Sequence, residues 1–292
     1  MKFFRFSFAS AIAATLFITV SAQAFCGLQS CPRIDPHGQT HPYTAGVRAR
    51  LTGFDIDNES GYYGIVSPHL FVRTPFLSNL SLGVEVPWVT LHTADDETSG
   101  LGNPLLTAQY ARRLSHDFSA EAGLQLELPF GDHDHGLADD HYMLLPWVGA
   151  RYEWGTAWYA SGMMGFSQAV GGEDDAADTT ASARIAGSTL AKAAHADHGA
   201  AAEPLLVNPH GDREVQWRAA LGYRPRARWI VEGFGLGTVD ISESTPEYYV
   251  RAGVSSEWSL TEALGLQVIA DAPVTSARRS DATIGVDFKY GW

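Results

Sequence analysis

The stretch FSAEAGLQLELPF, residues 118–130, alternates between two kinds of side chain. Its even positions, from Phe118 to Phe130, are all apolar, whereas its odd positions hold serine, glutamate, glycine, glutamine and proline. Successive side chains of a β-strand point to opposite faces of the sheet. The stretch therefore predicts a strand with one apolar and one polar face. It is long enough to cross a bilayer on a tilt, which takes about nine to eleven residues.

The same alternation recurs along the chain, most clearly in residues 80–88, 214–223 and 281–292. A soluble β-sandwich also alternates, but here the runs are long and their charged residues fall on the face opposite the aliphatic one. These features favour an all-β fold, a transmembrane antiparallel up-and-down β-barrel. Bacterial barrels have an even number of strands. We expect about twelve, near residues 43–54, 62–74, 80–91, 102–113, 118–130, 141–154, 157–169, 213–224, 227–240, 247–258, 263–272 and 281–292.

The predicted connections alternate between tight turns and mostly longer loops. In bacterial barrels short turns face the periplasm and long loops face outward. Aromatic residues gather where a barrel meets the two membrane interfaces, whereas the core tryptophans of a soluble β-protein would not cluster at one end of the hairpins. Five tryptophans lie beside the predicted short turns or at the C-terminus: Trp154, Trp158, Trp229, Trp258 and Trp292. A second girdle would draw on Trp88, Phe130, Tyr142, Trp217 and Tyr248.

The N-terminus has the features of a cleavable signal peptide over residues 1–24. Lys2 and Arg5 precede a largely apolar run, and Ala22-Gln23-Ala24 has the small-x-small pattern that signal peptidase cleaves. We expect residues 25–42 to form a periplasmic segment and residues 43–292 to form the barrel. The expected location is the cell outer membrane.

Cys26 and Cys31 are the two cysteines of the chain. In an oxidising periplasm the simplest expectation is a small disulfide loop. A thiolate metal site is the alternative, although two thiols lack the four ligands of a structural zinc site.

Charge narrows the choice of partners. The chain has 33 acidic and 20 basic residues, with a formal net charge of −13, which argues against nucleic acid as a partner because nucleic-acid binding depends on cationic side chains. The expected partners are outer-membrane lipid, the barrel-assembly machinery, and a small solute or metal ion.

An outward apolar face places charged side chains of both signs inside the barrel. They could line a narrow polar path for a small solute, or pair across the lumen and hold it shut. The predicted lumen-lining residues are Arg48, Arg50, Glu85, Glu121, Glu127, Arg151, Glu153, Arg218, Glu232, Arg251, Asp271 and Asp287.

Histidines and carboxylates share two predicted external loops. Imidazole and carboxylate together suit divalent transition metals, and the intervals H-x-H and H-x-x-H allow chelation. The alternative is a solvated, calcium-tolerant surface loop. The candidate metal ligands are His133, His135, His141, His195, His198 and His210.

The longest connection, residues 170–211, is expected to lie outside the barrel or to fold into its lumen. Its alanine-rich part, residues 179–202, could form a short helix that acts as a plug. A disordered surface loop is equally compatible with its Asp, Ser, Thr and Gly content.

Two regions resemble known outer-membrane proteins. The last strand carries Phe288, Tyr290 and Trp292 and is similar to the C-terminal signal that the barrel-assembly machinery recognises. The stretches LGVEVPW (82–88) and GLGN (100–103) resemble the outer-membrane channels named for the meta-pathway of phenol degradation. That family usually has aspartate at the fourth position of the second motif, where this chain has Asn103. The resemblance implies a transport-type barrel and no particular substrate.

The sequence thus predicts a passive outer-membrane channel or transporter for small solutes, with metal binding by external loops as an elaboration and no required cofactor. One alternative is a non-conducting metal-binding or adhesive surface barrel. A barrel enzyme is disfavoured, because the His-x-Ser tripeptide that barrel phospholipases would require is absent from the sequence. Asp139-Asp140-His141 matches the Asp-x-His spacing of the omptin proteases, but the predicted strand count differs from theirs.

Overall fold

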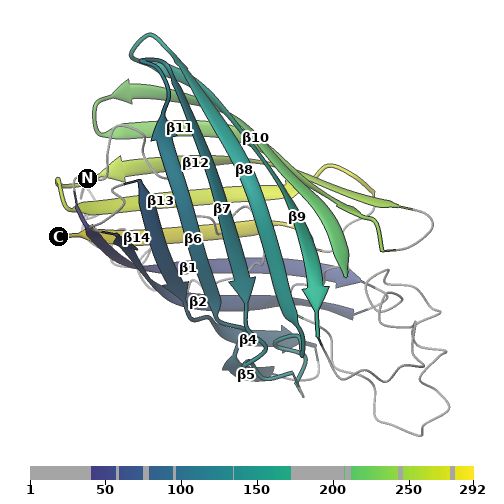
Figure 1. The fold of residues 1–292 in the computed structure, drawn as a ribbon. Helices are drawn as coiled ribbons and strands as arrows, with labels where there is room; N and C mark the ends of the chain where they lie inside the picture. Colours follow the sequence, from purple (N-terminus) through teal and green to yellow (C-terminus); the bar gives the residue numbers. More distant parts are fainter. Residues whose placement is uncertain are drawn as a thin grey trace, which may run out of the picture.

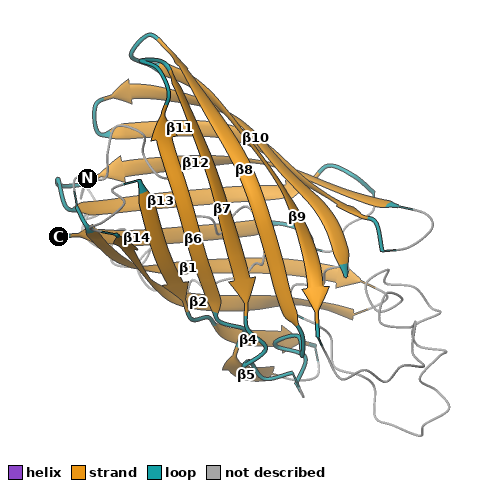
Figure 2. Ribbon diagram, in the orientation of Figure 1, coloured by secondary structure: helices purple, strands orange, loops and turns teal. Residues whose placement is uncertain are grey.

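The computed structural model describes residues 41–56, 59–74, 79–94, 97–133, 135–171, 207, 212–242, 246–276 and 280–292. In these ranges the regular structure is entirely β (Figure 2). The strands are β1 (Tyr43–Ile56), β2 (Glu59–Arg73), β3 (Leu80–Glu85), β4 (Trp88–Thr93), β5 (Glu97–Leu101), β6 (Leu105–Arg113), β7 (Phe118–Glu127), β8 (Tyr142–Trp154), β9 (Trp158–Val170), β10 (Arg213–Arg226), β11 (Trp229–Asp240), β12 (Glu247–Ser259), β13 (Leu264–Pro273) and β14 (Thr283–Gly291).

The strands form one antiparallel sheet that closes on itself (Figure 1). Closure occurs at β1, which pairs with β2 on one side and with β14 on the other. This closure pairs the first and last strands of the wall, as the absence of water in a bilayer requires; β5, near the long-loop end, pairs with β4 alone. The predicted all-β, antiparallel barrel is confirmed.

The fourteen strand segments make twelve passes through the barrel wall. β3 and β4 are two parts of one pass, since β2 pairs with both of them. β5 and β6 likewise make one pass, because β5 pairs with β4 and β6 pairs with β3. The sequence predicted these passes as unbroken strands, whereas Pro87 and Pro104 lie at the two interruptions. Proline has no N–H to donate to a sheet ladder. The prediction of twelve passes is nevertheless confirmed.

Both ends of the barrel chain meet at one end of the molecule (Figure 1). Tyr43 and Trp292 stack with ring centroids 5.7 Å apart, and the Trp292 amide donates to the Tyr43 carbonyl at 3.1 Å. We call this the short-turn end, because the connections β6–β7, β8–β9 and β10–β11 lie there, and the opposite end the long-loop end. In bacterial barrels the short turns face the periplasm.

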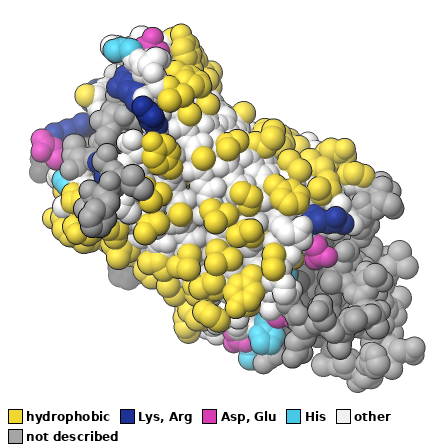
Figure 3. Space-filling view, in the orientation of Figure 1, with side chains coloured by type: hydrophobic (Ala, Val, Ile, Leu, Met, Phe, Trp, Pro, Cys, Tyr) yellow, Lys and Arg dark blue, Asp and Glu magenta, His cyan; other side chains and the backbone are white. Residues whose placement is uncertain are grey.

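Apolar side chains cover the outer wall, and the charged groups on the visible face lie toward its two ends (Figure 3). On the outer wall Leu124, Val148 and Val254 are exposed by 43%, 61% and 60%. Such a belt matches the hydrocarbon core of a bilayer. No helix in the described part of the chain is long and apolar enough to cross a membrane.

The outward aromatic residues follow the predicted girdles at several positions. Trp154, Trp158 and Trp292 are 40–50% exposed at the short-turn end. Trp88 and Tyr248 are exposed as well. The predicted signal peptide (1–24), the cysteine pair Cys26 and Cys31, and the alanine-rich segment 179–202 all lie outside the described residues, so these predictions stay predictions.

Candidate channel lumen

The first group of polar side chains inside the barrel lies on β14, β1, β2 and β3. Arg48 donates to Glu85 at 2.8 Å and to Asp287 at 3.4 Å. Asp287 also lies 3.7 Å from His69 Nε2 and 3.6 Å from Lys289 Nζ. Sheet closure creates this group, because Arg48 faces Asp287 directly across the β1–β14 pair.

A second group lies on the other side of the barrel, on β8 to β11. Arg218 forms an ion pair with Glu232, and the Tyr159 hydroxyl donates to the same carboxylate at 2.9 Å. The guanidinium of Arg151 lies over the Tyr159 ring, 3.6 Å from its centroid, and pairs with Glu153 at 2.7 Å. Charged groups buried in this way need both ion partners and hydrogen bonds, and Glu232 has both.

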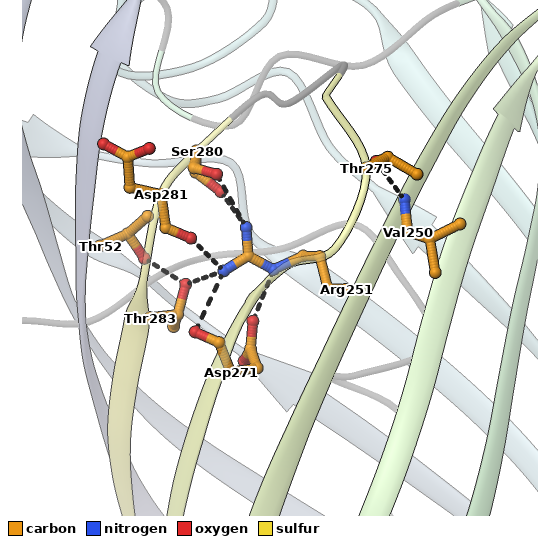
Figure 4. A network of polar contacts seen from close by, with 8 residues as sticks. All are labelled: Thr52, Val250, Arg251, Asp271, Thr275, Ser280, Asp281 and Thr283. Carbon is orange, nitrogen blue, oxygen red and sulfur yellow. Dashed lines mark hydrogen bonds and ion pairs between the residues drawn. The ribbon is translucent and has the colours of Figure 1, made fainter.

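A third group surrounds Arg251 near the long-loop end (Figure 4). The Arg251 guanidinium donates to Asp271 Oδ1 at 2.5 Å and to Ser280 Oγ at 2.6 Å. It also reaches the Asp281 carbonyl and Thr283 Oγ1, both at 3.0 Å. Arg251 therefore joins β12 to β13 and to the segment that leads into β14.

The remaining predicted lumen residues are also placed by the structure. Glu121 accepts from Gln109 at 3.0 Å, and Glu127 accepts from Asn103 at 3.0 Å. Arg50 is buried. The charges thus form ion pairs and hydrogen bonds between nearby strands of the inner wall. That they pair across the lumen and hold it shut stays a prediction. That they also line a solute path stays a prediction.

Apolar residues also face the inside of the barrel, and these were not predicted from the sequence. One buried cluster combines β1, β2 and β4 at the long-loop end with two loop residues; its members are Phe54, Tyr63, Ile65, Val89, Leu91, Leu137 and Val207. A second joins Leu145, Trp147 and Met163, and a third joins Ala220, Phe234 and Leu236. One sequence feature could have predicted these inward apolar residues. The run 142–148, YMLLPWV, is apolar on both faces of its strand.

Several inward aromatic rings lie over a glycine of the neighbouring strand. Trp147 faces Gly123 across the β7–β8 pair, and a Cβ at that glycine would lie 2.5 Å from the indole. Tyr159 faces Gly222 in the same way across β9–β10. Each ring therefore lies along the wall instead of projecting across the barrel.

The candidate metal ligands are not brought together in the described chain. His135 Nδ1 lies 2.8 Å from Asp132 Oδ1, and His141 Nδ1 lies 3.5 Å from Asp140 Oδ1, while His133 is exposed. Among the described residues no group of three or more His, Cys, Asp or Glu is arranged to hold a metal ion. His195, His198 and His210 lie outside the described residues, so metal binding stays a prediction.

The C-terminal aromatic residues all point to the outer face. Phe288, Tyr290 and Trp292 are about half exposed, and the rings of Tyr290 and Trp292 lie 6.0 Å apart. Their recognition by the barrel-assembly machinery stays a prediction.

A closed twelve-pass barrel with an apolar outer belt and a largely polar interior is an outer-membrane β-barrel. The chain belongs to the family described as "Putative MetA-pathway of phenol degradation", whose model matches residues 38–202. No curated protein sequence matches the chain.

Solved structures that share the fold include an outer membrane channel and two porins. An outer membrane channel from Pseudomonas putida F1 has a TM-score of 0.65 at 12% identity, over 89% of this chain and 99% of that one. The KdgM porin has a TM-score of 0.51 at 11% identity, over 85% of this chain and 99% of its own. The NanC porin has a TM-score of 0.51 at 8% identity, over 85% and 100%.

Proposed function

We propose that this barrel is a passive channel for small solutes that carry both a polar and an apolar part. The observation that carries the proposal is the inner wall, which has both ion-paired groups such as Arg48–Glu85 and apolar clusters such as Leu145–Trp147–Met163. Ligand sites commonly combine an apolar lining with a few fixed polar groups that orient the ligand. The similar structures, named as a channel and porins, and the family match support a transport role.

The proposal is tested by single-channel conductance of the refolded mature protein in a planar bilayer. We expect discrete conductance steps that a small aromatic acid such as benzoate reduces, since its carboxylate and ring fit the two kinds of inner surface. Conductance steps that benzoate leaves unchanged would contradict the solute class. Absence of steps would contradict the channel and leave a closed surface barrel.

Metal binding by the external loops is a second proposal, favoured by the close pair of His135 and Asp132. The same recordings are repeated with micromolar zinc or copper. We expect the metal to change conductance in the unmodified protein and not in a variant with His133, His135, His141, His195, His198 and His210 changed to alanine. Equal responses in the two proteins would contradict it.

A further inference from the structure

The β7–β8 loop, described over residues 128–133 and 135–141, is fastened to the edge of β5 that faces away from β4. The Asp132 amide donates to the Leu101 carbonyl at 2.7 Å. Asn103, which follows β5, binds both limbs of the loop: its Oδ1 accepts from the Gly131 amide at 3.0 Å, and its Nδ2 donates to the Asp139 carbonyl at 2.9 Å. Asn103 Nδ2 also donates to Glu127, the last residue of β7, at 3.0 Å.

Glycines make room for this close approach. A Cβ at Gly100 would lie 2.9 Å from Asp132 Oδ2 and 3.0 Å from Leu137 Cδ1. A Cβ at Gly131 would lie 2.9 Å from the backbone nitrogen of Asn103. The motif Gly100-Leu101-Gly102-Asn103 therefore acts as a docking strip for the loop.

The loop carries an apolar side chain into the barrel. Leu137 is 3% exposed and packs in the cluster of inward residues from β1, β2 and β4. Val207, from the β9–β10 connection, joins it there, and its amide donates to the Gly136 carbonyl at 2.9 Å. The chain thus fills an apolar part of its own inner wall with two loop side chains.

We propose that the β7–β8 loop is a gate, in which Asn103 holds the loop closed and Leu137 occupies the apolar surface that a passing solute must contact. The inference rests on the proposed channel function and concerns how that channel is regulated. A solute whose apolar part displaces Leu137 gains the same buried contacts that Leu137 loses. The loop therefore inhibits the channel until a solute displaces Leu137.

The gate is tested by locking and releasing the loop in the refolded mature chain. Gly100→Cys with Asp132→Cys places the two Cβ atoms 3.2 Å apart, slightly closer than the separation of about 3.5–4.5 Å in disulfides. Cys26 and Cys31 are changed to serine in this background. We expect conductance of the oxidised pair to fall at least about tenfold below that of the same protein after reduction, since a fixed loop keeps Leu137 in place.

Two further variants release the loop. Asn103→Ala removes the bonds to both limbs and is expected to raise the fraction of time that the channel is open. Replacing residues 129–141 with Asn-Gly, which favours a two-residue hairpin turn, should give the largest conductance. The matched control is the cysteine-free background, whose conductance should not respond to oxidant.

The outcomes separate the gate from the channel. Equal conductance of the oxidised and reduced pair, with the disulfide verified by mass, would overturn the gate and leave the channel intact. Wild-type conductance in both release variants would overturn it as well. No conductance in any variant, including a folded barrel with the shortened loop, would overturn the channel and the gate together.

Discussion

At the scale of single residues, inward aromatic rings depend on the glycines that they cover. A Cβ at Gly222 would overlap the ring of Tyr159, whose hydroxyl donates to the buried carboxylate of Glu232. The glycine is therefore needed for the ring to lie along the wall and for its hydrogen bond to form.

We predict that Gly222→Ala lowers the free energy of unfolding by about 1–3 kcal/mol, the usual cost of overpacking. The measurement is urea unfolding of the barrel in lipid vesicles. The control is Gly233→Ala in the facing strand, because no atom lies within 4 Å of a Cβ built there. An equal loss in both variants would show that glycine content, and not the Tyr159 contact, sets the stability.

At the scale of elements, Arg251 holds the start of β14 against β12 and β13. It binds three side chains and the Asp281 carbonyl at once, a geometry that suits the planar guanidinium and that a lysine ammonium cannot reproduce. The Asp281 amide in turn donates to the Gly53 carbonyl at 2.8 Å.

We predict that Arg251→Lys speeds amide hydrogen exchange at Asp281 by about tenfold or more, since exchange reports local opening. Arg251→Gln should have a similar effect, because it too loses the guanidinium fork. Exchange at Glu121, which lies in the β6–β7 pair, serves as the internal reference and should stay unchanged. Wild-type exchange at Asp281 in the lysine variant would mean that charge alone holds the segment.

At the scale of the whole molecule, barrel closure brings the last strand beside the first. Trp292 stacks on Tyr43 at this seam and also belongs to the C-terminal aromatic series. Its loss should affect assembly more than the loss of another tryptophan at the same end.

We predict that Trp292→Ala slows barrel assembly several-fold, measured as the appearance of the folded, heat-modifiable band on a gel during expression. Trp154→Ala is the matched control, because Trp154 is also exposed at the short-turn end and stacks on Tyr152 at 6.2 Å. Equal rates in the two variants would contradict a special role for the C-terminal residue.

The sequence by itself determined the alternating strands, the twelve passes and the outward apolar face. These follow from local alternation, since the direction of a side chain in a strand depends only on its position in the chain. Strands such as residues 118–127 show the pattern without knowledge of their neighbours. The family resemblance, carried by residues 82–88 and 100–103, is confirmed by the family match.

Only the tertiary structure decided which inner residues meet. Arg48 contacts Glu85 and Asp287, which lie 37 and 239 residues away, because strand register and closure set these neighbours. The inward apolar residues Leu145 and Trp147 were missed since their strand is apolar on both faces. The docking of the β7–β8 loop on Asn103 depends on contacts between separate loops and strands, and no local pattern encodes such contacts.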